Sequence, residues 1–299
     1  MDFKSTFSFS ASPASTPALS VLPVGRRFRG GALGQWLAVL LFVGLPFIGA
    51  NILTKLFMAD PGLRDARNLI KVLVLMGAYF AYVRWWERRP VDEFSLQAAS
   101  REFAGGLLLG GALIAAVVAM LALVGAYTVQ SVGSASDFAR VFTEMMPKVA
   151  VGAVIEELLF RLIALRLLER SVGTAWALLI SSVLFGLAHL GNAGASPLIG
   201  LMLGIELGLL LGAAYVLTRR LWLCVGVHLA WNFVQGAVFG ISVSGHTDEG
   251  WLRASLTGPD WLSGGTFGVE GSAVSLLLCL LAAGVLWVQA SRRGQFKAR

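Results

Sequence analysis

Long apolar runs dominate this chain and restrict what it can fold into. Beyond about residue 30, eight runs each come close to the roughly 20 residues that an α-helix needs to cross a bilayer. A spanning segment must satisfy its backbone polar groups internally, and these runs are continuous rather than alternating, which excludes a β-barrel. We therefore predict an all-α polytopic membrane protein, a bundle of about eight transmembrane helices. The predicted spans are 33–53, 69–86, 105–127, 148–169, 173–190, 197–217, 221–240 and 272–290.

The composition agrees with a membrane protein. Hydrophobic residues make up 57% of the chain and charged residues 14%, which excludes an ordinary soluble domain. The net charge is +7, but the basic residues lie between apolar runs and form no stripe that would bind nucleic acid. We therefore expect membrane lipid, and no nucleic acid, as a partner. Cys224 and Cys279 fall in different predicted spans at different depths, so we expect no disulfide between them.

The distribution of Lys and Arg predicts the topology. The predicted loops and tails carry 16 basic residues on one side of the membrane and 7 on the other. Basic residues near span ends stay in the cytoplasm, so we expect an integral multi-pass protein with both termini cytoplasmic. We predict a disordered tail over 1–31, one helical domain over 32–291 with a functional core at about 145–240, and a basic tail over 292–299.

Ionisable side chains within three predicted spans mark the candidate site. Each costs at least roughly 2.5 to 3.5 kcal/mol to insert, so a function is the first explanation for it. Glu157 and Arg161 share one helical face, whereas Glu156 is turned about 100° away and is left free of that pair. The spans carry Glu156-Glu157-x-x-x-Arg161, Phe185-x-x-x-His189 and His228-x-x-x-Asn232.

These residue types suit amide hydrolysis in a shielded cavity. A free glutamate can take a proton from water, and histidine and asparagine can stabilise an oxyanion. Glu156, His189 and His228 are also a ligand set for a hydrolytic zinc ion, with water as the fourth ligand. The spacing leaves two cofactor states open, no metal or one divalent metal such as zinc.

Together the three motifs resemble those of the CAAX prenyl protease and bacteriocin-processing (CPBP, or Abi) family of intramembrane endopeptidases. The resemblance implies an eight-helix bundle with an intramembrane cavity and a membrane-bound or lipidated peptide as substrate. It implies that Glu156 activates water with His189, that His228 and Asn232 stabilise the oxyanion, and that Glu157 and Arg161 support the site with Phe185. The segment 264–271 is also similar to a loop of bacterial members.

A different class of function is the alternative. A non-catalytic scaffold, an immunity protein or a small transporter could use the same polar residues to line a path or join helices. Glu206 matches no motif, and we predict for it an interhelical contact or a place in a cavity wall. Gly200, Gly204, Gly208 and Gly212 recur at every fourth position and predict a face on which another helix packs closely.

Overall fold

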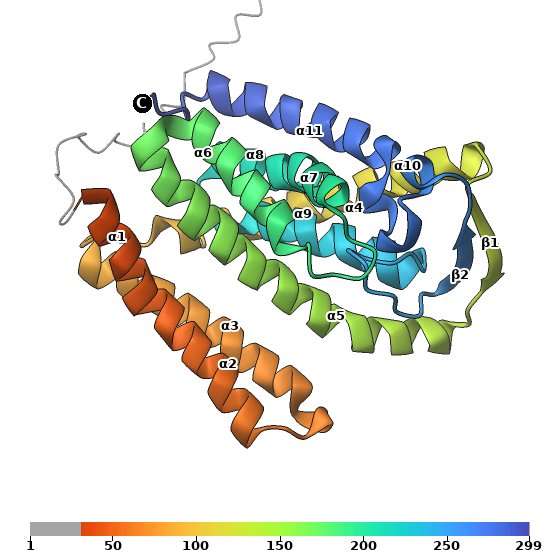
Figure 1. Cartoon of the computed structure of the whole chain (residues 1–299), viewed down its shortest axis with the longest axis horizontal. Coiled ribbons are helices and arrows are strands. Elements are labelled where there is room, and N and C mark those ends of the chain that lie inside the picture. The colour runs from red at the N-terminus through yellow and green to blue at the C-terminus, as the bar shows by residue number, and fades with distance from the viewer. Residues whose placement is uncertain (1–30, 299) are drawn as a thin grey trace, which may run out of the picture.

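The computed structural model describes residues 31–298 and is built almost entirely of helices (Figure 1). The predicted N-terminal tail lies outside the described residues, apart from Gly31. Several helices continue into one another through short π-helical stretches. The helices are α1 (Gly31–Val39), α2 (Leu45–Phe57), α3 (Arg64–Ala81), α4 (Ala99–Leu123), α5 (Ala135–Glu157), α6 (Arg166–Ala188), α7 (Pro197–Leu203), α8 (Leu209–Thr218), α9 (Leu221–Phe233), α10 (Asp260–Ser263) and α11 (Ala273–Arg292).

Within residues 31–298, seven helical stretches are long and apolar enough to cross a membrane. The chain is therefore an all-α polytopic membrane protein, as its sequence predicts, and the eight predicted spans appear here as seven stretches. The stretches are Gly31–Phe57, Pro61–Trp86, Ala99–Leu123, Ala135–Ala188, Pro197–Thr218, Leu221–Val238 and Ala273–Arg292.

The count differs because one stretch, Ala135–Ala188, contains two of the predicted spans. Its 54 residues would extend about 80 Å as one straight helix, far more than the hydrocarbon core of a bilayer. Gly173 breaks the stretch with φ 78° and ψ 169°, a conformation that glycine adopts without strain. Beyond Gly173 the chain packs back, so that the ring of Phe185 lies 5.2 Å from that of Phe160.

The helix α5 begins 13 residues before the predicted span at 148. Ser134 and Asp137 form a capping box that fixes this start, and the first turns of the helix carry polar side chains. Just before it, β1 (Tyr127–Val132) pairs antiparallel with β2 (Leu252–Leu256), a small sheet that the sequence analysis did not predict. The two segments lie almost wholly outside the predicted spans, where strand pairing satisfies the backbone, and β1 carries the β-branched Thr128, Val129 and Val132.

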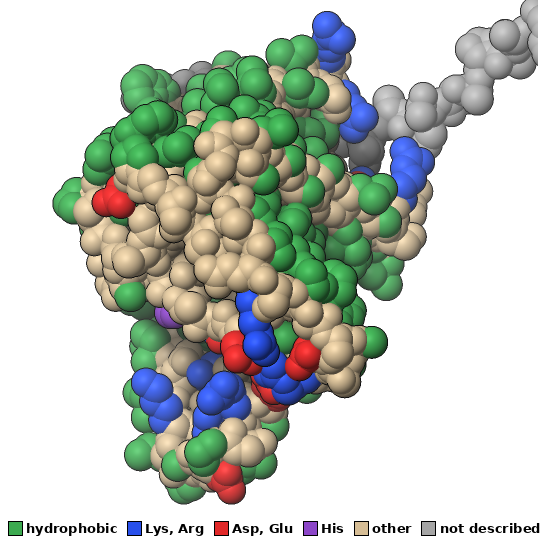
Figure 2. All heavy atoms as spheres, turned by 90° about the vertical axis from the view of Figure 1, so that its right-hand side faces the viewer, with side chains coloured by type: hydrophobic (Ala, Val, Ile, Leu, Met, Phe, Trp, Pro, Cys, Tyr) green, Lys and Arg blue, Asp and Glu red, His purple; other side chains and the backbone are tan. Residues whose placement is uncertain are grey.

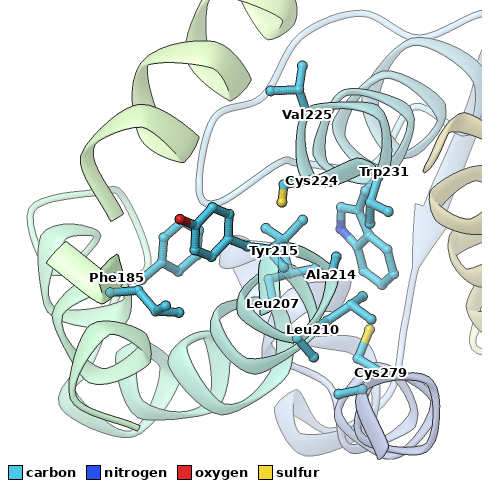
Figure 3. Packing of buried hydrophobic residues seen from close by; sticks show 14 of the residues in the cluster. Phe185, Leu207, Leu210, Ala214, Tyr215, Cys224, Val225, Trp231 and Cys279 are labelled. Carbon is cyan, nitrogen blue, oxygen red and sulfur yellow. The ribbon is translucent and has the colours of Figure 1, made fainter. Parts of the chain in front are cut away.

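The core of the bundle lies around α8, between α9 and α11. Figure 3 shows Leu210 and Tyr215 of this region packed between the two helices, with Cys224 on one side and Cys279 on the other. Both cysteines are free and buried.

The helix α6 packs closely on the small residues before α8. A methyl group added to Gly204 would lie 2.6 Å from the Ser182 carbonyl oxygen, and one on Gly208 would lie 2.8 Å from Ser182 Cβ. These glycines thus form the predicted packing face, and its partner is the helix that ends at His189.

Helices at the periphery present apolar side chains outward. Only 28% of the apolar window of Gly31–Phe57 is buried, against 72% of that of Pro197–Thr218. The hairpin of α2 and α3 extends away from the bundle (Figure 1). Figure 2 shows hydrophobic side chains over much of one face and charged ones gathered toward its lower part. Exposed apolar surface of this extent suits a lipid environment.

Ion pairs join one end of the bundle. The carboxylate of Glu87, just after the second stretch, pairs with Arg89, Arg166 and Arg170 at 2.7 to 2.8 Å, and Glu93 pairs with Arg89. We call these five residues the arginine network.

Two more ion-pair groups lie beside the network. Glu169 pairs with Arg219 and Lys297, and Arg220 pairs with Glu102. Basic residues that the sequence analysis assigned to one side of the membrane therefore meet at one end of the bundle. They are Arg89, Arg166, Arg170, Arg219, Arg220 and Lys297.

Candidate active site

Three helices deliver the candidate residues to one place. Glu156 and Glu157 end α5, and Arg161 lies in the π-helical stretch Leu158–Leu165 that follows. Such stretches are common at functional sites because they re-aim side chains within a helix. Phe185 and His189 lie in and after the last turn of α6, which the reversal at Gly173 brings back beside α5. His228 and Asn232 come from α9.

The Glu156 carboxylate lies between two imidazoles. Its Oε2 is 3.7 Å from His189 Nε2 and 3.8 Å from His228 Nε2. These separations exceed a direct hydrogen bond. Oε2 is buried and has no hydrogen-bond partner among the described residues, while the side chain as a whole is 30% exposed. One oxygen of this glutamate is thus unbonded and enclosed, and other atoms of the side chain are exposed.

Hydrogen bonds on the far side of each imidazole fix its orientation. His189 Nδ1 lies 2.8 Å from the Phe185 carbonyl oxygen, which can only accept, so Nδ1 carries the proton. His228 Nδ1 lies 2.8 Å from Glu157 Oε1 and donates to that carboxylate. Both Nε2 atoms therefore face Glu156, and in the neutral rings both carry the lone pair.

Glu157 and Arg161 form a sealed ion pair behind His228. Arg161 Nε lies 3.1 Å from Glu157 Oε2, and the two side chains are 2% and 0% exposed. The guanidinium also donates to the carbonyl oxygens of Leu207 and Gly208 at 3.3 and 3.4 Å. The pair thus ties the end of α5 to the helix leading into α8 and anchors His228 through Glu157.

Phe185 packs against both imidazoles and against Arg161. Its ring centroid lies 4.8 Å from that of His189 and 6.1 Å from that of His228. The Arg161 guanidinium lies 4.7 Å from the same ring, within the range of a cation–π contact. The buried phenyl ring therefore contacts both histidines and the cation.

Asn232 shares the α9 face of His228, one turn further on. Its Oδ1 is buried without a hydrogen-bond partner in the described part of the chain. In that part, no hydrogen bond joins Asn232 to Glu156, His189 or His228. The structure therefore brings six of the seven predicted residues into mutual contact and leaves Asn232 beside them.

The alternative of a metal site does not fit this arrangement. Among residues 31–298, no group of three or more His, Cys, Asp and Glu side chains is arranged to hold a metal ion. The residue types of Glu156, His189 and His228 suit zinc, but their mutual placement does not.

An apolar groove lies beside α9. Its volume is about 350 Å³, and it borders the turn that carries His228 and Asn232. The residues lining it come from α4, α5 and the end of α9; they are Phe103, Leu107, Met146, Leu229, Ala230, Phe233 and Val234.

Two fully buried acids were not assigned to the site from the sequence. Glu206 accepts a hydrogen bond from Ser275 of α11, which is the interhelical contact that the sequence analysis allowed for it. Glu270 lies in the segment before α11, and burial raises its pKa to about 7 against the lowering effects of Ser244, His228 and Trp231. The sequence did carry a signal for the burial of Glu270. It lies between Gly268 and Gly271 at the start of an apolar run, and a glycine-rich turn there can pack closely enough to exclude solvent.

Comparison with known proteins finds the same segment. Residues 138–234 match a family model described as type II CAAX prenyl endopeptidase Rce1-like, which confirms the family resemblance drawn from the three motifs. The match covers α5, α6 and α9, and with them Glu156, His189, His228 and Asn232. The searches of the curated proteins and of the solved structures found no match.

Proposed function

We propose, from the premise that residues 138–234 form an Rce1-like domain in a multi-pass membrane protein, that this chain is a glutamate-dependent intramembrane endopeptidase. It hydrolyses a peptide bond of a membrane-associated peptide or protein, CAAX-type prenylated substrates among them. The observation that carries the proposal is the convergence of both Nε2 atoms on Glu156 Oε2, at 3.7 and 3.8 Å.

In the proposed reaction Glu156 and His189 orient a water molecule, and Glu156 takes one of its protons. The oxygen attacks the carbonyl carbon of the scissile bond, and the negative charge moves to the carbonyl oxygen. The C–N bond then breaks as Glu156 gives the proton to the leaving nitrogen.

In this mechanism, His228 and Asn232 stabilise the oxyanion by donating hydrogen bonds to it. His228 can donate from Nε2 only when its ring carries both protons, because Nδ1–H is bonded to Glu157. The Glu157 carboxylate then balances the imidazolium, and Arg161 balances Glu157 in turn. Asn232 supplies a side-chain amide one turn further along the same face.

The substrate's apolar part suits the groove beside α9. Its walls are hydrophobic and aromatic, as binding sites for apolar ligands usually are. A lipid chain or an apolar peptide segment in this groove would bring the adjoining polar backbone to His228 and Asn232. We further propose that both termini lie in the cytoplasm, on the side where the arginine network concentrates basic residues.

Cleavage by the purified protein in lipid nanodiscs tests the function. A panel of prenylated and unmodified membrane peptides is incubated with the wild type, with Glu156→Gln and with Glu206→Gln, and the products are identified by mass spectrometry. Glu206→Gln is the matched control, since Glu206 is a buried glutamate of the same bundle outside the site. We expect products from the wild type and the control only; equal cleavage by folded Glu156→Gln would refute the proposal.

Chelation separates glutamate from metal chemistry. If Glu156 activates water directly, 1,10-phenanthroline leaves the cleavage rate unchanged. Loss of cleavage with the chelator, followed by recovery with added zinc, would instead assign Glu156, His189 and His228 to a metal ion.

A further inference from the structure

Glu270 is a fully buried carboxylate that the proposed reaction does not use. It lies in the segment Val269–Gly271, immediately before α11. Its Oε2 accepts two hydrogen bonds from Ser244, from the backbone N–H at 2.6 Å and from Oγ at 2.8 Å. Both donors belong to the same residue, so the two bonds together fix the position of Ser244 relative to Glu270.

Ser244 needs such a hold because of its backbone conformation. Its φ is +46°, in the left-handed region that residues with a side chain rarely adopt. A conformation of this kind is strained and persists only where neighbouring contacts impose it. The two bonds from Ser244 to Glu270 are contacts of that kind, so the Ser244 turn depends on the carboxylate.

The turn at Ser244 also bonds to the loop that follows His189. The Ser244 carbonyl accepts a hydrogen bond from Asn192 Nδ2 at 2.9 Å. The Asn192 N–H donates to the His189 carbonyl at 3.0 Å. The backbone of His189, just beyond the last residue of α6, is held by the Gly186 carbonyl on the helix side and by Asn192 on the loop side. A continuous path of bonds therefore runs from Glu270 through Ser244 and Asn192 to His189.

Close backbone packing reinforces this path. A methyl group on Gly245 would lie 2.1 Å from the Ala193 carbonyl oxygen, and one on Gly268 would lie 2.0 Å from the Ser242 carbonyl oxygen. Both glycines also have positive φ, at 81° and 105°. Three segments thus pack without intervening side chains, so a shift of one transmits to the next.

We propose that Glu270 is a positioning residue for this enzyme: through Ser244 and Asn192 it holds the 190–195 loop and thereby keeps His189 Nε2 aimed at Glu156. The expected effect on catalysis rests on the proposed function. The contacts that hold the loop are present whether or not that function is correct. A misplacement of about 1 Å at a reacting group can cost as much as 10²-fold in rate, so a distant carboxylate can control the turnover number.

Glu206 provides a matched control within the same molecule. It is also fully buried, and a serine, Ser275, also donates to it. Its partner lies on α11, however, and not in the turn beside the His189 loop. A general effect of removing a buried acid therefore appears in both Glu206→Ala and Glu270→Ala, whereas an effect on His189 appears in Glu270→Ala alone.

Kinetics and hydrogen exchange in nanodiscs test the assignment. For Glu270→Ala and Asn192→Ala we expect kcat to fall about 10-fold or more with KM within about twofold, and the double variant to be no worse than either single one. Glu270→Gln keeps an oxygen that accepts from Ser244 and is expected to restore kcat to within about threefold of the wild type. Amides of 190–196 should exchange about 10-fold faster in Glu270→Ala and unchanged in Glu206→Ala.

Two results would overturn the inference: equal kcat losses in Glu206→Ala and Glu270→Ala at equal thermal stability, or additive losses for Asn192→Ala and Glu270→Ala. If Glu270→Ala fails to fold, Asn192→Ala and Ser244→Ala carry the same test. If the wild type cleaves nothing, the proposed function fails, and the exchange of 190–196 alone decides whether Glu270 holds the loop.

Discussion

The arginine network and the candidate active site use buried charge in opposite ways. In the network, Glu87 is shared among Arg89, Arg166 and Arg170, so that every charged group has a partner of opposite sign. In the site, Glu157 is matched by Arg161 and His228, while Oε2 of the adjacent Glu156 has no hydrogen-bond partner among the described residues. The difference separates charge that holds helices together from a carboxylate oxygen that no described residue bonds.

Glu156→Gln is expected to have the largest effect. Removing a general base should lower kcat/KM about 10³-fold, with thermal stability unchanged because the side chain is partly exposed and its Oε2 unpaired. Glu87→Gln serves as the contrast and should keep kcat/KM within about threefold below its melting temperature. Cleavage assays with both variants make the comparison; similar losses in the two would remove the distinction between the regions.

Arg161→Met should have the next largest effect, and on stability. It leaves the sealed Glu157 carboxylate with His228 as its remaining partner, and an uncompensated buried charge costs about 3 to 5 kcal/mol. Arg170→Met should cost about 1 kcal/mol, since Glu87 still has Arg89 and Arg166. Thermal unfolding in nanodiscs measures both, and adding Glu157→Gln to Arg161→Met should recover part of the loss.

Acid should weaken the network as the pH falls below the ordinary pKa of a glutamate. Burial alone would raise the pKa of Glu87, but Arg166, Arg170 and Arg89 overcome it and lower the pKa to about 2. A carboxyl of lowered pKa stabilises the fold above its unfolded value and loses that contribution as pH falls from about 4.5 to about 2, about 3 kcal/mol in all. Unfolding between pH 6 and 2 should show this loss in the wild type and not in Glu87→Gln; the same slope in both would assign it to another group.

Exposed ion pairs should matter least. Lys148 and Asp248 pair across α5 and the 241–251 loop, with side chains 45% and 35% exposed. Lys148→Met is expected to change the unfolding free energy by about 0.2 to 1 kcal/mol, and 0.5 M salt should remove the difference. A fall in the unfolding free energy of more than about 2 kcal/mol would mean that this exposed pair stabilises the fold as strongly as the buried ion pairs do.

The sequence was sufficient to predict the parts of the site that follow from helical periodicity. Glu157 and Arg161 are four residues apart, and the structure joins them at 3.1 Å. The motifs also predicted which helices meet, and six of the seven site residues are in contact. The predicted spans, by contrast, missed the early start of α5, 13 residues before the span that begins at 148. Helix tilt and the early start of α5 are tertiary properties, which a count of residues from a loop does not contain.

The roles of Glu270 and of the small sheet could not be read from the chain in the same way. Ser244, Asn192 and Glu270 are far apart in sequence and meet only because three loops fold onto one another. The segment 241–271, which no predicted span covers, contains β2 and α10 as well as these turns. Periodicity identifies elements that face a core, and it carries no signal for contacts between turns.

The reversal at Gly173 has a consequence for biogenesis. Thr174, directly after it, bonds through its backbone and its hydroxyl to Lys297, and Arg219 donates to the carbonyl of Gln295. Gln295 and Lys297 are synthesised about 120 residues after the turn. The hairpin that carries Glu156 and His189 is therefore made before the residues that bond to its turn exist. Gln295 and Lys297 therefore contact this part of the bundle only after the rest of it has been synthesised.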